Sequence, residues 1–138
     1  MRRAMLSGLV IIVAVLLSAS GAAPQELLLH PKYHLPASCF AYVGEEAKPT
    51  TWKLPYRLAD GQVDRRRLPI AIQAVLSTYR GRKARIPEAA LPEVLTTLGR
   101  AAAEIGKLAP RAAHAGPVYR ELADALEQRG LLDEALKD

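Results

Sequence analysis

Residues 52–106 decide the fold of this chain. They read WKLPY at 52–56, LPIAIQAVLSTYRG at 68–81 and LPEVLTTLGRAAAEIG at 91–106. The first piece is typical of an extended segment, whereas the other two repeat apolar residues at the 3.6-residue period of a helix. A basic linker separates the two helical pieces. We therefore expect an extended segment followed by two neighbouring helices.

The first helix is predicted from its apolar positions and from the residues at its ends. One face of such a helix carries Leu68, Ile72, Val75, Leu76 and Tyr79. Pro69 has a fixed φ and no N–H, which suits the first helical position, and Gly81 can adopt the left-handed conformation that ends a helix. The pattern therefore predicts a helix from Pro69 to Arg80.

The second helix is predicted in the same way, since Pro92 opens it and Gly106 closes it. Its apolar face carries Leu91, Val94, Leu95, Leu98, Ala102 and Ile105. A three-turn helix does not persist alone in water, so the first helix needs its apolar face covered. We expect the second helix, Trp52 and Tyr56 to cover it, with Trp52 capping the helical hairpin.

Two further helical segments follow a linker at 107–116. Pro117 begins a third helix that Gly130 ends, and residues 131–137 have the pattern of another helical turn or two. The predicted fold class is therefore mainly α, a small bundle of three to four helices. The residues that we expect in its structural core are Trp52, Tyr56, Leu68, Ile72, Val75, Leu76, Tyr79, Leu91, Val94, Leu95, Leu98, Ile105, Leu122 and Leu126.

The N-terminal residues have the pattern of a targeting signal. Residues 1–22 begin with Arg2 and Arg3, continue as an apolar run and end in small residues, which is typical of a secretory signal peptide. An uncleaved membrane anchor is the alternative, although the apolar run is short for a spanning helix. We expect export to the periplasm or beyond, and no transmembrane segment after cleavage. The mature chain then divides into an extended segment at 23–49 and a helical domain at 50–138.

The extended segment is rich in proline, which argues against a helix. Residues 39–43 are strand-like and residues 50–56 form a second extended piece, so the two could pair as a short β-hairpin. Pro55 instead favours an edge strand or no sheet at all. The sequence leaves both alternatives open.

Positive charge gathers around the first predicted helix, where residues 65–87 contain seven basic side chains and no acidic one. We name this set the basic rim, and it consists of Arg65, Arg66, Arg67, Arg80, Arg82, Lys83 and Arg85. Such a cluster can attract an anionic surface such as lipid head groups. The alternative is that these residues only lie in two solvated loops, where the charge of Arg80 interacts favourably with the negative C-terminal end of the helix.

Residues that could carry chemistry are few. His30 and His34 have a spacing that would suit a metal on a helix, with Cys39 nearby, but Pro31 and Pro36 argue against a helix there. Cys39 could serve as a nucleophile only with a base such as His34 in contact. The sequence shows no catalytic motif, and we expect neither a metal nor another cofactor.

Two weak resemblances accompany these patterns. The residues TTWKLPY at 50–56, the helical stretch that follows, Ile86-Pro87, and LGRAAAEIG at 98–106 together resemble a small uncharacterised helical module of bacterial hypothetical proteins and phage-head-associated proteins. That resemblance covers about 55 of 138 residues, implies the helical hairpin and assigns no catalytic residue. The stretch at 119–136 resembles a single tetratricopeptide repeat.

We expect this chain to be a small exported protein that binds or scaffolds a partner and is not an enzyme. The partner is unknown, and a protein or an anionic envelope surface is favoured over a nucleic acid. The alternative is a small exported thiol-dependent enzyme or redox protein that uses Cys39 with His34. Accessibility of the Cys39 thiol distinguishes the two classes, because a nucleophile must reach its substrate.

Overall fold

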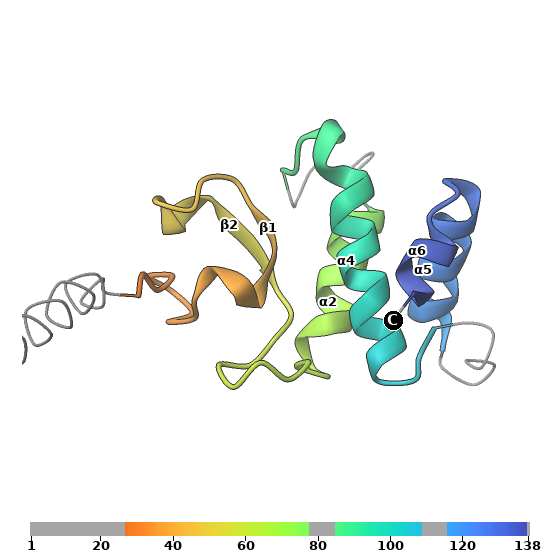
Figure 1. Cartoon of the computed structure of the whole chain (residues 1–138), viewed down its shortest axis with the longest axis horizontal. Coiled ribbons are helices and arrows are strands. Elements are labelled where there is room, and N and C mark those ends of the chain that lie inside the picture. The colour runs from red at the N-terminus through yellow and green to blue at the C-terminus, as the bar shows by residue number, and fades with distance from the viewer. Residues whose placement is uncertain (1–26, 78–84, 109–115, 138) are drawn as a thin grey trace, which may run out of the picture.

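The computed structural model describes residues 27–77, 85–108 and 116–137. Within these ranges the chain is mainly α and forms a small helical bundle, as predicted, together with one short β-hairpin (Figure 1). The helices are α2 (Arg67–Leu76), α4 (Leu91–Glu104), α5 (Pro117–Gln128) and α6 (Leu132–Leu136). The strands are β1 (Phe40–Val43) and β2 (Trp52–Pro55).

The helices and the hairpin stand side by side along the molecule. In Figure 1 the hairpin lies on one side of α2 and α4, and α5 and α6 lie on the other. Helix α4 packs against α2, α5 and α6, and α2 also packs against α5. The largest side chains that are wholly buried in this bundle are those of Leu68, Ile72, Leu98, Leu122 and Leu126. Each of them contributes about 1.5–3 kcal/mol through the apolar surface that it removes from water.

Helix α2 differs from the predicted helix at both ends. It begins at Arg67 rather than Pro69, because the Asp64 carboxylate accepts hydrogen bonds from the N–H groups of Arg66 (2.9 Å) and Arg67 (3.1 Å). This side chain satisfies donors that a helix start leaves without a partner. The helix ends at Leu76, and the predicted continuation to Arg80 lies outside the described residues, as does Tyr79.

The ends of the other helices follow their proline and glycine residues. Pro92 is the second residue of α4, and Pro117 is the first residue of α5. Gly130 follows α5 with a φ of 73°, and the next N–H, that of Leu131, donates to the Leu126 carbonyl over 2.8 Å. This six-to-one hydrogen bond needs a residue that tolerates positive φ, which glycine does without strain. The tight turn brings α6 back onto α4.

The two strands pair antiparallel, with Phe40 opposite Pro55 and Val43 opposite Trp52. The hairpin that the sequence left open therefore forms, and it joins residues on both sides of the domain boundary that we placed at residue 50. Pro55 is the last residue of β2, where the missing N–H costs the ladder little. Leu54 has a φ of 66°, a conformation that costs a leucine free energy and is tolerated where the surrounding packing fixes it.

Trp52 does not cap the helical hairpin, which corrects our expectation. Its ring is buried in a second, smaller cluster with Leu35, Cys39 and Phe40, and it lies 5.6 Å from the Phe40 ring. The indole N–H donates to the Glu45 carbonyl over 2.9 Å. Between Trp52 and the start of α2, the residues that enter the helical core are Leu54, Tyr56 and Val63. The hairpin thus has an aromatic core of its own, and it also packs against α2 and α4.

An ion pair ties the hairpin side of the molecule to the end of α4. Arg57 donates through Nη2 to Glu104 Oε1 (2.9 Å) and through Nη1 to Glu104 Oε2 (3.3 Å). The Arg57 guanidinium also donates to the Gly61 carbonyl and lies over the Tyr56 ring. Hydrogen bonding to Arg57 lowers the pKa of Glu104. Because the Glu104 side chain is half exposed, we expect this pair to contribute no more than about 1 kcal/mol.

None of the helices in the described ranges is long and apolar enough to span a membrane. The predicted signal peptide at 1–22 lies outside those ranges.

Candidate functional site

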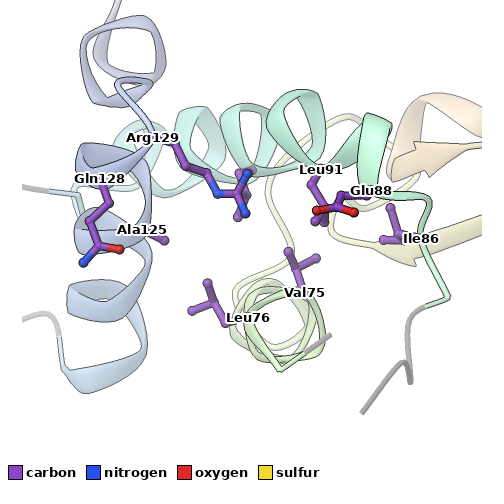
Figure 2. A pocket seen from close by; sticks show the side chains of 9 residues that line it. Val75, Leu76, Ile86, Glu88, Leu91, Ala125, Gln128 and Arg129 are labelled. Carbon is purple, nitrogen blue, oxygen red and sulfur yellow. The ribbon is translucent and has the colours of Figure 1, made fainter. Parts of the chain in front are cut away.

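A cleft of about 480 Å³ lies where the ends of α2 and α5 meet the beginning of α4 (Figure 2). We name it the α2–α4–α5 cleft. It is lined by Val75, Leu76, Ile86, Glu88, Leu91, Leu95, Ala125, Gln128 and Arg129. Six of these nine side chains are apolar, so the cleft offers an apolar floor with a polar edge.

The floor is built by residues that the helices bring to one place. Leu91 and Leu95 are one turn apart on α4, and Leu76 comes from the last turn of α2. Ala125 on α5 is small and leaves the space open. We had assigned Leu76 and Leu91 to the structural core, and both are half-buried at its border. Their exposed surfaces make them part of the cleft.

Two opposite charges stand at the edge of the apolar floor. Figure 2 shows the Arg129 side chain reaching along α4 towards the side on which Glu88 stands, with Gln128 further out on α5. Both charged side chains are exposed. Neither takes part in an ion pair or a side-chain hydrogen bond within the part of the chain that the structure describes. They are therefore available to a ligand.

Each of these charges also has a local structural reason. Arg129 follows the C-terminal end of α5, and Glu88 opens the short 3-10 turn η3 (Glu88–Ala90) that leads into α4. A cation near the end of a helix and an anion near its beginning are both favourable to the helix dipole. Variants at these positions therefore need a measurement of stability beside one of binding.

Sequence reasoning did not single out Glu88, Gln128 or Arg129. Their local signals are those of ordinary helix ends, namely an acid before Leu91 and a base before Gly130. Only the packing of α5 across α2 and α4 brings them to one cleft. Forty residues of sequence separate Glu88 from Gln128, and no periodic pattern connects them.

The described members of the basic rim stand at opposite ends of α2. Arg65 and Arg66 are exposed just before the helix, and Arg85 is exposed beyond its other end. A ten-residue helix separates the two groups by about 15 Å. Arg67 is engaged within the molecule, since its guanidinium lies 4.8 Å from the Tyr33 ring centroid and 3.8 Å from Asp64.

The remaining members of the basic rim, Arg80, Arg82 and Lys83, lie outside the described residues. The structure therefore places no single basic face among the residues that it describes. Arg65 and Arg66 stand together at one end of α2, whereas Arg85 stands beside Ile86 at the border of the α2–α4–α5 cleft.

The Cys39 thiol is buried and engaged. The residue is 2% exposed, and its Sγ donates to the Leu58 carbonyl over 3.3 Å. Burial raises the pKa of the Cys39 thiol, which disfavours the reactive thiolate. No hydrogen bond joins Cys39 to His34 in the described residues, and His34 is exposed. These features favour a packing role for Cys39.

Two of the three residues considered for a metal, His30 and Cys39, are likewise used for packing, whereas His34 is exposed. Residues 27–77, 85–108 and 116–137 contain no group of three or more His, Cys, Asp or Glu side chains that could hold a metal ion. Instead, His30 stacks on Phe40 at 5.1 Å, and its Nδ1 accepts hydrogen bonds from the N–H groups of Lys32 (3.0 Å) and Tyr33 (3.3 Å). The ring thus closes the turn at residues 30–33.

This arrangement predicts that the N-terminal segment loses stability in mild acid. Burial, with Lys32 nearby, lowers the pKa of His30 below its ordinary value of about 6.5. The unfolded chain therefore binds the proton first, and the free energy of unfolding falls as the pH falls below about 6.5. Urea titrations at pH 7.5 and pH 5.5 measure this fall.

The control for this prediction is the pair His30→Asn and His34→Asn. Asparagine at position 30 keeps an acceptor for the turn but does not titrate, so most of the loss between pH 7.5 and pH 5.5 should vanish. His34→Asn removes only one of the lesser charges that lower the pKa of His30, so it should reduce the pH dependence much less than His30→Asn does. An equal effect of both substitutions would contradict the role given to His30.

A second hollow of about 510 Å³ lies between β1 and the first half of α4. Less apolar surface faces this hollow than faces the α2–α4–α5 cleft, and its lining carries one charged side chain, that of Glu93. We therefore take the α2–α4–α5 cleft as the candidate site, because it combines accessible apolar side chains with charges that have no partner in the described chain.

Comparison with protein-family models, with curated proteins and with solved structures finds no match for this chain.

Proposed function

We propose that this chain is a small exported binding or scaffold protein, without enzymatic activity, that holds a partner at the α2–α4–α5 cleft. The observation that carries the proposal is the cleft of about 480 Å³, in which Leu76 and Leu91 present apolar surface beside the charges of Glu88 and Arg129. The volume of this cleft lies within the range of known ligand-binding sites. Export rests on the signal-peptide pattern of residues 1–22.

Binding accounts for the cleft better than catalysis does. General acid–base or nucleophilic chemistry needs a reactive side chain in contact with the group that activates it. Glu88 and Arg129 make no such contact with one another. Cys39 lies in the other cluster with its thiol buried. The apolar floor, in contrast, has a direct use, because a partner that covers it removes that surface from water.

A second candidate surface is the end of α2 that carries Arg65 and Arg66. Both side chains are exposed and have no ion-pair partner in the described residues. This end of the molecule could engage an anionic component of the cell envelope. Binding there would weaken strongly as salt rises, because the Debye length shortens from about 10 Å at 0.1 M to about 3 Å at 1 M.

A substitution that fills the cleft tests the proposal. Ala125 lines the cleft and is half-buried on α5, so Ala125→Arg places a long side chain in the cleft without removing a core residue. The matched control is Ala59→Arg in an exposed turn. Mature protein and both variants are used for affinity capture from a native envelope extract at low and high salt, with quantitative mass spectrometry of the eluates.

We expect Ala125→Arg to reduce the captured partner by at least about tenfold, which corresponds to about 1.4 kcal/mol of binding free energy. Ala59→Arg should leave the capture unchanged. Capture that survives Ala125→Arg but disappears in Arg65→Gln/Arg66→Gln would move the function to the other end of α2. Capture that no variant alters would contradict both surfaces.

A further inference from the structure

We infer that the partner of the α2–α4–α5 cleft is an amphipathic helix that carries one acidic and one basic side chain beside its apolar stripe. This inference rests on the proposed function, and it adds the chemistry of the partner. The acidic side chain would pair with Arg129 and the basic one with Glu88, while the apolar stripe would cover the floor of the cleft.

The pair of charges decides among the ligand classes that an apolar floor could bind. An anionic amphiphile such as a fatty acid would pair with Arg129, but its carboxylate would be repelled by Glu88 at the same cleft. A cationic amphiphile would meet the opposite problem. A ligand with both charges satisfies both side chains, and a peptide carries them together with apolar groups.

The shape of the cleft favours a helix over an extended peptide. Its walls are the ends of three helices, and its lining offers side chains rather than an open strand edge to which an extended peptide could hydrogen-bond. Leu76 on α2 and Leu91 on α4 each present partly exposed apolar surface at the cleft, and the apolar stripe of a further helix can cover both. Ala125 is small enough to let that helix approach closely.

Synthetic peptides test the inference directly. Four helical peptides share one leucine stripe at i, i+4, i+7 and i+11 and differ at two positions that flank it, which are Glu and Lys, Glu and Glu, Lys and Lys, or Gln and Gln. Residues on the opposite face balance the net charge. The dissociation constant of each peptide for the mature protein is measured by fluorescence anisotropy, and the contacted residues are identified from amide chemical shifts.

We expect the Glu and Lys peptide to bind most tightly. Each correct charge pair at an exposed edge should strengthen binding by about twofold to fivefold over the Gln peptide, and the advantage should shrink in 1 M salt. Charge reversal in the protein should change the order. Arg129→Glu should come to prefer the Lys and Lys peptide, and Glu88→Lys should come to prefer the Glu and Glu peptide. Thermal melts of both variants establish that the fold is kept.

The other outcomes overturn the inference. Equal binding of all four peptides, or an order that the two reversals leave unchanged, shows that the charges do not recognise the partner, although the cleft as a binding surface stands. Tighter binding of decanoate than of any peptide at the cleft residues overturns the helix as the occupant. When no peptide shifts the cleft amides and Ala125→Arg also leaves capture from the envelope extract unchanged, the proposed function fails together with the inference.

Discussion

Replacing Trp52 by alanine is expected to lower the free energy of unfolding by about 3–5 kcal/mol. The residue is 2% exposed, it packs against Phe40, and its indole N–H donates to the Glu45 carbonyl. The substitution removes the largest side chain of the N-terminal cluster and leaves that carbonyl without its donor. Equilibrium unfolding in urea, followed by circular dichroism, measures the change.

The location of the loss is part of this prediction. Because Trp52 belongs to the hairpin cluster and not to the helical core, hydrogen exchange should accelerate first in β1 and β2 and less in α4 and α5. Trp52→Phe is the graded control, since it keeps an aromatic ring and loses the N–H donor. A near-native melting temperature for Trp52→Ala would contradict the packing described here.

Replacing Gly99 by valine is expected to lower the free energy of unfolding by about 1–3 kcal/mol. The loss is expected even though glycine is itself unfavourable in the middle of a helix. A Cβ at this position would lie 2.7 Å from Leu126 Cδ1 and 2.8 Å from Ala135 Cβ. Ala135 Cβ is bonded directly to the α6 backbone, so it cannot rotate away as the end of a longer side chain can. Gly99 therefore sets how closely α5 and α6 approach α4.

The direction of the change in melting temperature for Gly99→Ala tests this prediction further. Alanine is favoured over glycine in a helix by about 1 kcal/mol, so an open position would be stabilised by the change. We expect a lower melting temperature instead, and we expect Ala135→Gly in the same chain to recover part of the loss by removing the clashing Cβ. A rise in the melting temperature of Gly99→Ala alone would contradict the close approach.

The helical part of the fold could be predicted from the sequence because its signals are local. Apolar spacing identified the helices, and Pro92, Pro117 and Gly130 marked their ends, since each acts on its own backbone. The start of α2 was placed two residues late. Asp64 could have indicated the earlier start, because its carboxylate accepts hydrogen bonds from the N–H groups of Arg66 and Arg67. The prediction instead used Pro69 as the first helical residue.

The partner of Trp52 could not be predicted in this way. Its burial depends on Leu35, Cys39 and Phe40, which precede it by 12 or more residues and reach it only through the pairing of β1 with β2. A four-residue strand carries too few alternating positions to fix its partner. Most of the stretch that contains Phe40 and Cys39 was expected to be extended, and nothing in it indicated a separate core.

The cleft was missed for a related reason. Leu76 and Leu91 continue the apolar stripes of their helices, so periodicity assigns them to the core, and whether they are covered depends on how far a third helix extends. Ala125 on α5 and Arg129 just after it decide this, some fifty residues after Leu76. Periodicity predicts which face of a helix is apolar, and only the packing of the helices shows where that face stays open.

The most direct measurement of the central claim is photo-crosslinking from the cleft in the cells that make the protein. The photoreactive residue p-benzoylphenylalanine replaces Gln128, which lines the cleft, or Gln62, which is exposed in a turn of the hairpin side. We predict an adduct with one protein from position 128, none from position 62, and loss of that adduct when Ala125→Arg is added. Equal adducts from both positions, no adduct from position 128, or an adduct that survives Ala125→Arg would contradict the assignment of the cleft as the binding surface.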